Sequence, residues 1–511
     1  MIALALGMQG QNKSENKLVK KYLKEGQIHV FQEDYYQAWK SYSKVLKLDK
    51  QNDLASVNGA ICIYKLNYSA DSASAFEKNL ALSKFNDAKY YLAWIKHQQR
   101  SFDEAILLLQ DYNKLPVKDR LNGVEETEYF IQVCNNAKNF IKHPLRSIIK
   151  NMGSGVNSAF PDYVPVMLPD ESALFFTSRR DGSSNNKKDA GNNFYEDVYV
   201  SYKQDNQYRQ AQNVGAPINT ETNDACVAIS PDGKRMIVYR TSTDELTGNL
   251  YISKIGAKNS WSDPEKISSE INSSYIETSA CFSNDTSEIY FSSDRPGGFG
   301  GKDIYRIKKM PDGQWAMPFN LGAGINTARD DDAPFLHPDG VTLFFSSQGH
   351  NTMGGFDVFK SVLDINVNQF SEAENLGYPI NDVGNDVFFV LSADGQRGYY
   401  SSIKKETFGG NDIYQIDTRF GENDLAIKQG KALMDEMPGR VKITLMDKEN
   451  NEVNGNYYSD SRTGKFFLVM NPLKSYWAIV ESEGYETLKV DVKPIALEKT
   501  NQDLEFKIEK K

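Results

Sequence analysis

The sequence predicts a multidomain fold made of an α-helical solenoid, a five-bladed β-propeller and a C-terminal β-sandwich. Three observations predict it: apolar residues follow helical spacing early in the chain, one short phrase recurs five times in the middle, and strand-like alternation follows. The 511 residues also exceed what one hydrophobic core normally serves. We therefore expect separate domains at residues 16–142, 144–419 and 428–511.

The repeated phrase is clearest at residues 320–326 (NLGAGIN) and 375–381 (NLGYPIN). Weaker copies lie at residues 151–157, 213–219 and 266–272. The final asparagines of successive copies are 53 to 62 residues apart. A recurrence of this length is typical of repeat architectures, in which each repeat is one supersecondary unit.

The same succession of elements follows each copy of the phrase. An acidic residue comes five positions after the asparagine, and a short apolar run leads to a turn such as Pro338-Asp339-Gly340. Proline presets the first turn angle and glycine accepts a positive φ, so the turn is a tight hairpin. A strand that ends in serine, a glycine-rich loop and another strand complete the unit. Each unit therefore offers four short strands, the content of one propeller blade.

The order of these elements predicts how the ring closes. A last-strand phrase at residues 146–157 precedes the first complete unit, whereas the final unit stops after Ile416 without one. An unpaired sheet edge is a liability that closed architectures remove. We therefore expect residues 148–152 to complete the blade formed by residues 388–416.

The units resemble the WD40-like (PD40) propeller repeat of TolB-like and OmpA-family periplasmic proteins. The resemblance rests on the motifs S-P-D-G, G-G-x-D-I-Y and N-L-G-x-x-I-N and covers about half of the chain. It is specific for the repeat and not for a function. The second unit departs from it, because residues 244–249 (DELTGN) stand where the glycine pair is expected.

Small residues predict closely packed helices in the N-terminal part. Gly26, Ala60 and Ala93 recur at intervals of 34 and 33 residues, which lets paired helices approach closely. This pattern resembles about three tetratricopeptide repeats over residues 16–115. The resemblance implies a solenoid whose groove holds a peptide or a partner protein. The alternative is that these helices only space or cap the propeller.

The C-terminal part alternates as in a small sandwich, for example at residues 441–445 and 476–480. With a T-G-x-F turn and a G-Y corner, it resembles the carboxypeptidase regulatory-like domain, which has no catalysis of its own. The domain order is similar to that of PorE-type components of type IX secretion systems and related OmpA-family proteins. In that family a peptidoglycan-binding OmpA-like domain follows. We expect it to be missing here, so peptidoglycan association would need a missing domain or a partner.

Composition and the first residues bear on location and partners. A net charge of −9 argues against nucleic acid, because neutralising phosphates requires clustered Lys and Arg. No run of eighteen apolar residues exists that could cross a membrane as a helix. The apolar start at residues 1–12 is interpreted as a signal-peptide remnant, which predicts export to the periplasm and association with the outer membrane. A frayed cytoplasmic terminus is the alternative.

The four scattered cysteines are expected to be buried as small hydrophobes.

Enzyme signatures and cofactor motifs are absent from the sequence. The repeated acids need separate attention, because a propeller brings equivalent residues together around one axis. They could ring the channel mouth, hold a cation or act as paired acids. Alternatively, each accepts hydrogen bonds from backbone N–H groups of a neighbouring blade, and the regular spacing favours this structural role. The repeat acids are Asp162, Asp224, Glu277, Asp331 and Asp386, and the weak candidates for a metal are Asp330, Asp331 and Asp332.

These observations favour a non-enzymatic periplasmic scaffold. It would bind envelope proteins through the helical groove and one propeller face, in a type IX secretion or other cell-envelope complex. A peptidoglycan- or glycan-binding propeller is the alternative. A propeller hydrolase, with Asp331 as a required acid, is a third possibility. No cofactor is expected.

Overall fold

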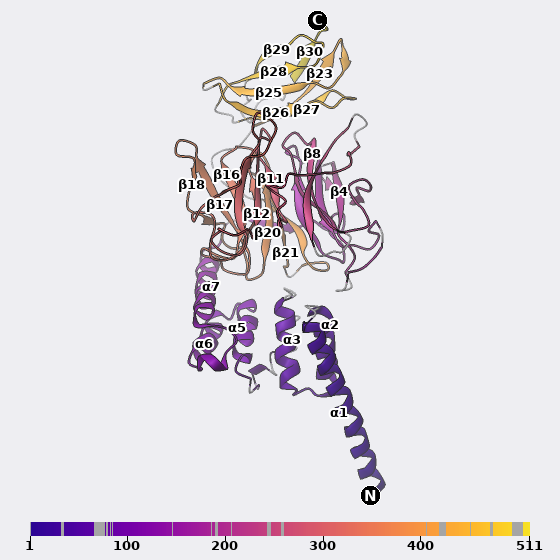
Figure 1. The fold of residues 1–511 in the computed structure, drawn as a ribbon, viewed down its shortest axis with the longest axis vertical. Coiled ribbons are helices and arrows are strands. Elements are labelled where there is room, and N and C mark those ends of the chain that lie inside the picture. Colours follow the sequence, from indigo (N-terminus) through magenta and orange to yellow (C-terminus); the bar gives the residue numbers. More distant parts are fainter. Residues whose placement is uncertain are drawn as a thin grey trace.

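The computed structural model arranges the helices, the propeller and the sandwich in that order along one long axis (Figure 1). The propeller lies in the middle, with the helices on one of its faces and the C-terminal sandwich on the other. The structure describes residues 2–511 with these exceptions: 32–34, 66–76, 78–79, 82, 84, 146, 185, 190–192, 206, 243–246, 257–259, 405, 418–425, 450, 471–473 and 493–503. The predicted propeller boundary at residue 419 thus lies outside the described residues.

Five antiparallel sheets form the propeller, and blades 1 to 5 are numbered here from the first repeat acid. In each blade the first strand lies innermost and the later strands follow outward. Blade 5 is β1-β22-β21-β20, so its outer strand comes from the beginning of the propeller sequence. The strands are β1 (Ile148–Asn151), β2 (Asp162–Met167), β3 (Ala173–Ser178), β4 (Asp197–Gln204), β5 (Gln207–Tyr208), β6 (Gln212–Asn213), β7 (Asp224–Ile229), β8 (Arg235–Thr241), β9 (Gly248–Lys254), β10 (Glu265–Lys266), β11 (Ala280–Phe282), β12 (Glu288–Ser293), β13 (Asp303–Lys308), β14 (Phe319–Asn320), β15 (Asp331–Leu336), β16 (Thr342–Ser347), β17 (Asp357–Asp364), β18 (Gln369–Phe370), β19 (Glu374–Asn375), β20 (Asp386–Leu391), β21 (Arg397–Ser402) and β22 (Asp412–Asp417).

The second strand of a blade has an apolar or aromatic centre because neighbouring blades cover both of its faces. Every residue of β3 is buried, and Phe176, Phe344 and Phe345 are at most 1% exposed. Burying one such aromatic side chain contributes about 2–3 kcal/mol. The aromatic repeats of the sequence are therefore packing between blades.

The repeated asparagine holds the third strand of its blade. Asn326 Oδ1 accepts a hydrogen bond from the Ile304 backbone N–H at 2.7 Å, and Asn326 Nδ2 donates to the Ile304 carbonyl at 3.0 Å. Asn157 makes the same two bonds to Ile413. A side-chain amide supplies one donor and one acceptor side by side, which explains why the repeat uses asparagine here.

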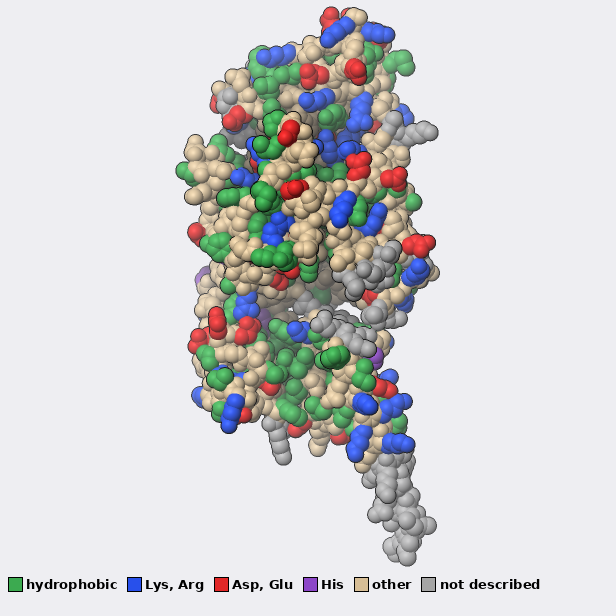
Figure 2. All heavy atoms as spheres, in the orientation of Figure 1, with side chains coloured by type: hydrophobic (Ala, Val, Ile, Leu, Met, Phe, Trp, Pro, Cys, Tyr) green, Lys and Arg blue, Asp and Glu red, His purple; other side chains and the backbone are tan. Residues whose placement is uncertain are grey.

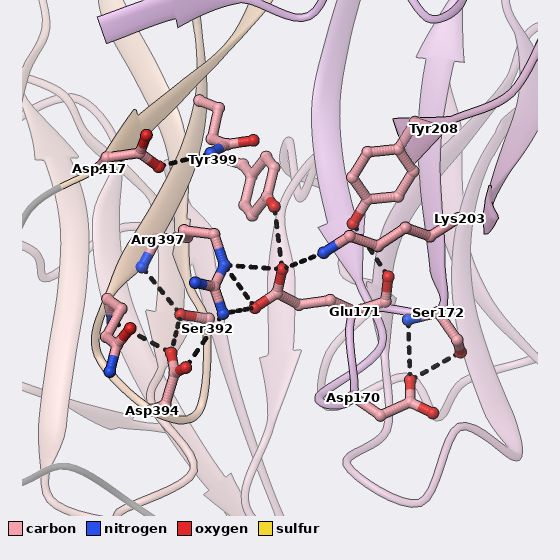
Figure 3. A network of polar contacts seen from close by, with 12 residues as sticks. Asp170, Glu171, Ser172, Lys203, Tyr208, Ser392, Asp394, Arg397, Tyr399 and Asp417 are labelled. Atoms are coloured by element: carbon pink, nitrogen blue, oxygen red, sulfur yellow. Dashed lines mark hydrogen bonds and ion pairs between the residues drawn. The ribbon is translucent and has the colours of Figure 1, made fainter. Parts of the chain in front are cut away.

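The ring closes through β1, as the sequence predicted. β1 pairs antiparallel with β22, and Ile149 lies opposite Ile416. A second closure lies in the turn of blade 1, where Glu171 holds φ +57 at the position that glycine takes in blades 2, 4 and 5. Its carboxylate accepts hydrogen bonds from Arg397 Nε and Nη2 at 2.6–2.9 Å and from Lys203 Nζ at 2.9 Å (Figure 3). Tyr399 Oη donates to the same carboxylate at 3.2 Å, so blades 1 and 5 share one buried ion-pair network.

The glycine-rich loops lie too close to the next blade for a side chain. A Cβ on Gly409 would meet the Ala159 backbone at 2.1 Å, and one on Gly354 would meet the Asp382 carbonyl at 2.3 Å. Gly384, in a neighbouring loop, has nothing within 4 Å of an added Cβ. The loops are structural bends that hold adjacent blades together.

We expect Gly409→Ala to lower the free energy of unfolding by about 1–3 kcal/mol, because overpacking against backbone forces the loop away from blade 1. Gly384→Ala is the matched control and should change stability by less than about 0.5 kcal/mol. Urea denaturation of both variants checks this. Equal effects would show that the loop contact contributes nothing.

The described residues before the propeller form six α-helices and one short 3-10 helix. They are α1 (Ile2–Phe31), α2 (Tyr35–Leu48), α3 (Asp53–Lys65), α5 (Ala88–Gln98), α6 (Phe102–Asn113), η1 (Val117–Asp119) and α7 (Val124–Lys142). Ala38, Tyr42 and Val45 share one buried face of α2 at helical spacing. A Cβ on Gly26 would lie 2.7 Å from the Tyr42 ring, so this small residue does permit close packing of α1 on α2. None of the helices, over the described residues, is long and apolar enough to cross a membrane.

The predicted α-helical solenoid is the part of the expected fold class that is wrong. Strands predominate in the described chain, and the helices are few. α5 and α7 pack against blade 4, where Met353 of the propeller is fully buried in the same cluster as Phe130 and Val133. The space of about 300 Å³ that these helices and α3 line is bounded on its other side by propeller loops. The spacing of small residues reports contacts between helices, and it carries no information about what covers their other face.

Two four-stranded sheets form the C-terminal sandwich around an apolar core. β23 pairs with β24, β27 and, in parallel, β30, while the second sheet has the order β26-β25-β28-β29. Ala393, in a turn of blade 5, packs with Val469 of the sandwich. The strands are β23 (Ala426–Met434), β24 (Met437–Pro438), β25 (Lys442–Asp447), β26 (Val453–Tyr458), β27 (Lys465–Met470), β28 (Tyr476–Glu481), β29 (Leu488–Val492) and β30 (Leu504–Ile508).

All four cysteines are buried free thiols, which confirms their predicted role as small hydrophobes. Burial raises the pKa of the Cys62, Cys134 and Cys281 thiols to about 12, so they stay uncharged. Cys226 and Cys281 lie on the first strands of blades 2 and 3.

Candidate functional site

A cavity of about 230 Å³ follows the axis of the propeller, where the first strands of the five blades meet. Its wall is mainly apolar, and Pro169, Pro231 and Pro338 line the end formed by the hairpin turns. Polar side chains line the opposite end, among them Tyr163 and Glu196. This end, called the axial mouth below, belongs to the face that receives the helices, and Figure 2 shows a recess there between the propeller and the helical part.

Bulges in the first strands set the direction of the side chains at the axial mouth. The register of β2 shifts between Tyr163 and Val166, and that of β15 shifts between Asp332 and Phe335. Val164 and Ala333 consequently hold φ +51 and +53, an unfavourable region for residues with a side chain. The Val164 N–H donates to Ser401 Oγ of blade 5 at 3.1 Å, which holds this bulge against its neighbour. Strained backbone of this kind clusters at functional sites.

The first charged group at the axial mouth belongs to blade 1. Tyr163 Oη donates to Glu196 Oε1 at 2.5 Å, and Arg179 Nη2 donates to the same oxygen at 2.9 Å. Arg179 also donates from Nε to Tyr163 Oη at 3.0 Å and pairs with Asp189 at 3.0 Å. The side chains of Arg179 and Glu196 remain 21% and 16% exposed, so solvent reaches both charges.

The second charged group belongs to blades 3 and 4. Asp332 accepts hydrogen bonds from Lys302 Nζ at 2.9 Å, from Ser292 Oγ at 2.6 Å and from Ser279 Oγ. Burial alone would raise the pKa of Asp332, but Lys302 and the two hydroxyls outweigh it and hold the pKa below its ordinary value. Lys302 Nζ also donates to Thr278 Oγ1 at 2.8 Å. Asp332 and Lys302 remain 16% and 23% exposed in their side chains.

The repeat acids do not line the axial cavity. All five are buried, and each accepts a hydrogen bond from a backbone N–H four residues earlier, in the loop that leads into its own strand. The expected donors were N–H groups of a neighbouring blade, so the contact is more local than predicted. Four of the acids also pair with a cation from the end of the second strand: Asp162 with Arg180, Asp224 with Arg240, Glu277 with Arg295 and Asp386 with Lys404.

Asp331 differs from the other repeat acids because no ion pair joins it to a cation in the described part of the chain. Gly349 stands at the chain position that Arg295 takes in blade 3. The adjacent His350 Nε2 lies 2.9 Å from the Ile325 carbonyl, a contact that Arg295 makes to Ile271 in its own blade. Burial raises the pKa of Asp331 to about 7 despite its hydrogen bonds to Thr327 and Ser347.

The three consecutive acids that were weak metal candidates diverge. Asp330 Oδ1 accepts from the Lys302 N–H at 2.9 Å, Asp331 lies inside blade 4, and Asp332 contacts Ser279 of the cavity wall. Within the described ranges, no group of three or more His, Cys, Asp or Glu side chains could hold a metal ion.

Sequence reasoning missed Glu196, Arg179 and Lys302, and it treated Asp332 only as part of an acidic cluster. A usable signal was present, because successive side chains of a strand point to opposite faces. The residue after each repeat acid therefore points the other way from the acid itself. Those residues are Tyr163, Ala225, Thr278, Asp332 and Val387.

Comparisons with known proteins return propeller enzymes at low similarity. No family model and no curated protein matches the sequence. A thermostable family-43 glycoside hydrolase is 13% identical over 53% of this chain and 91% of its own, with a TM-score of 0.35. An α-L-arabinofuranosidase from Lactobacillus brevis is 10% identical over 50% of this chain and 90% of its own, with a TM-score of 0.34. Bacillus subtilis levansucrase is 12% identical over 56% and 90%, with a TM-score of 0.38.

These neighbours contradict the expected non-enzymatic scaffold, because all three are named for carbohydrate-active enzymes. They equally contradict the tetratricopeptide and secretion roles assigned with it, do not bear on the resemblance to OmpA-family proteins, and leave the propeller as the shared feature. At these identities and TM-scores the likeness carries no argument about chemistry. The function is therefore argued below from the residues of the axial mouth.

Proposed function

We propose that this chain hydrolyses a glycosidic bond at the axial mouth of its propeller. The observation that carries the proposal is the placement of two partly exposed carboxylates about the axial mouth: Glu196 lines the cavity, and Asp332 lies behind Ser279, which lines it and donates to Asp332. Most glycoside hydrolases use such a pair on either side of the scissile bond. Tyr163, Tyr239 and Thr278 line the same end and offer aromatic faces and hydroxyls to a sugar.

Asp332 supplies the ionised carboxylate. Lys302 and two serine hydroxyls favour its charged form, as a base or nucleophile requires. We assign Glu196 as the acid that gives a proton to the leaving oxygen; because Arg179 donates to Glu196 Oε1 in this structure, the role requires a sugar hydroxyl to displace Arg179 first. In this structure Arg179 pairs with both Glu196 and Asp189. When a sugar hydroxyl displaces Arg179 from Glu196, the guanidinium of Arg179 therefore remains paired with Asp189.

We expect Asp332→Asn to lower kcat for an aryl glycoside by at least about 100-fold, because the amide is neither a base nor a nucleophile. Glu196→Gln should lose activity on glycosides with a poor leaving group and keep most of it on a dinitrophenyl glycoside, whose leaving group needs no proton. The measurement is a rate series over a panel of aryl glycosides. Asp330→Asn, outside the axial mouth, is the matched control and should retain activity.

Two outcomes would contradict the proposal. One is saturable sugar binding without turnover of any substrate in the panel. The other is turnover that survives both Asp332→Asn and Glu196→Gln, which would place the reaction elsewhere.

We also propose that the chain works after export, in the periplasm near the outer membrane. The apolar start of the sequence and the resemblance of its repeats to those of periplasmic OmpA-family proteins support this. Fractionation of cells that express the full-length gene product tests it, and recovery in the cytoplasm would contradict it.

A further inference from the structure

Blade 4 receives the helical part through two positions at its rim, and the end of α5 also contacts the loop that enters blade 5, where Gln98 Nε2 donates to the Val383 carbonyl at 2.6 Å. The first is Met353, whose side chain is fully buried by α5 and α7 and whose carbonyl lies 3.1 Å from His97 Nε2. The second is Arg329, which pairs with Glu126 of α7 at 2.6 Å and places its guanidinium 3.7 Å from the centre of the Tyr129 ring. A helix thus seats on one residue of the glycine-rich loop and on one residue of the loop that enters the blade.

Blade 3 presents apolar side chains at the same two positions, and they are exposed. Phe299 precedes its glycine pair as Met353 does, and Tyr275 precedes its repeat acid by two residues as Arg329 does. Phe299 is 51% exposed, Tyr275 is 44% exposed, and the adjacent Ile276 is 52% exposed. We call these three residues the blade 3 rim. Because the blades repeat, we expect these side chains to lie as close together as Met353 and Arg329, which both contact α7. Apolar side chains that gather on an exposed surface typically mark interaction sites.

The two loops hold their apolar residues in the same way. The Phe299 N–H donates to Asp303 Oδ2 at 2.7 Å, and the Met353 N–H donates to Asp357 Oδ2 at 2.7 Å. A Cβ on Gly300, which follows Phe299, would meet the Thr327 carbonyl at 2.4 Å, so the loop lies directly on the segment that carries Arg329. The blade 3 rim is therefore rigid and continuous with the surface that α7 already occupies.

We propose that the blade 3 rim binds an amphipathic α-helix of a partner protein. The helix would place an apolar stripe across Phe299, Tyr275 and Ile276, as α7 places Phe130 and Val133 against Met353. A side-chain amide in the stripe would donate to a loop carbonyl, as Asn136 of α7 donates to the Thr352 carbonyl at 2.8 Å. Helices that lay an apolar face on such a surface are a common recognition mode.

Blade 5 provides the matched control within the same chain. Phe408 occupies the position of Phe299 and is also 51% exposed, with its N–H bonded to Asp412 at 2.8 Å. The second position in blade 5 is Gly384, which has no side chain to contact a helix. Blade 5 thus carries one of the two anchors, and blade 3 carries both.

The test uses the full chain and a fluorescent peptide with the α7 sequence, residues 124–142, in which Glu126 is replaced by leucine. The Glu126 carboxylate pairs with Arg329 of blade 4. Blade 3 has Tyr275 at that position, so an apolar leucine is the better partner there. A lactam bridge on the outer face holds the helix, because an isolated helix of 19 residues is marginal in water. Fluorescence polarisation should show saturable binding, and the double variant Tyr275→Ser/Phe299→Ser should weaken it by at least about 10-fold.

Phe408→Ser should leave the peptide affinity unchanged, and both variants should retain the melting temperature of the parent. Absence of saturable binding would overturn the proposal, as would binding that is insensitive to the blade 3 substitutions. Binding of the full chain to phosphatidylglycerol vesicles that is lost in Tyr275→Ser/Phe299→Ser would overturn it in favour of a lipid surface.

Discussion

Replacing Arg397 by methionine should lower the free energy of unfolding by about 3–5 kcal/mol, the usual cost of removing one partner of a buried ion pair. Glu171 is 7% exposed in its side chain and accepts three hydrogen bonds from Arg397, while Lys203 remains as its only other cation among the described residues. Burial favours the neutral form of Glu171, but Arg397 and Lys203 outweigh it and lower its pKa. Without Arg397, the largely desolvated carboxylate of Glu171 keeps Lys203 as its remaining paired cation.

Arg235→Met is the matched control, because Arg235 occupies the same position in blade 2. It donates to Thr286 Oγ1 of blade 3 at 3.0 Å, as Arg397 donates to Glu171 of blade 1. Both arginines also pair with the aspartate of their own turn, Asp232 at 3.8 Å and Asp394 at 3.0 Å, so that loss is common to the two variants. A hydroxyl left without its donor costs about 1 kcal/mol, less than a desolvated carboxylate, so the control should cost less than Arg397→Met. Urea denaturation followed by tryptophan fluorescence measures both. Equal losses would show that the network between blades 1 and 5 adds nothing to an ordinary contact between blades.

The second large effect concerns pH. We expect the free energy of unfolding to fall as pH rises, and Asp331→Asn should remove part of this decrease. Burial raises the folded-state pKa of Asp331 to about 7, above an unfolded value of about 4. The folded chain therefore binds more protons than the unfolded chain between these values, so its stability decreases as pH rises from about 4 to 7. Three pKa units correspond to about 4 kcal/mol, which is the largest gain expected for Asp331→Asn at pH 8.

Asp162→Asn is the control for this prediction, since Arg180 pairs with Asp162 at 2.5 Å and would lose its partner. We expect it to destabilise the fold at pH 8, opposite in sign to Asp331→Asn. Asp357, whose pKa burial raises to about 8, should leave a residual slope in Asp331→Asn. Unfolding midpoints measured from pH 4 to 9 check the signs, and parallel profiles for parent and Asp331→Asn would contradict the argument.

Some features of the fold followed from local patterns. The recurrence of asparagine, acid, hairpin turn and glycine-rich loop predicted the units of the propeller and the pairing of β1 with β22. The same recurrence drew attention to the five repeat acids and away from the axial mouth. Glu196 precedes a third strand and Lys302 follows a glycine pair, and neither position is distinctive along the chain.

The sequence by itself determined the repeating unit, because turn chemistry, strand alternation and asparagine bonding act within a few residues or within one blade. It could not determine what lies at the axis or what covers the helices. Glu196 and Asp332 belong to blades far apart in the chain, and only the closed ring places Glu196 on the axial cavity together with Ser279, the lining residue that donates to Asp332. Likewise, only packing buries Met353 under α7 while Phe299, in the same local setting, stays exposed. Contacts between distant segments depend on how whole sheets and helices pack, which no local pattern records.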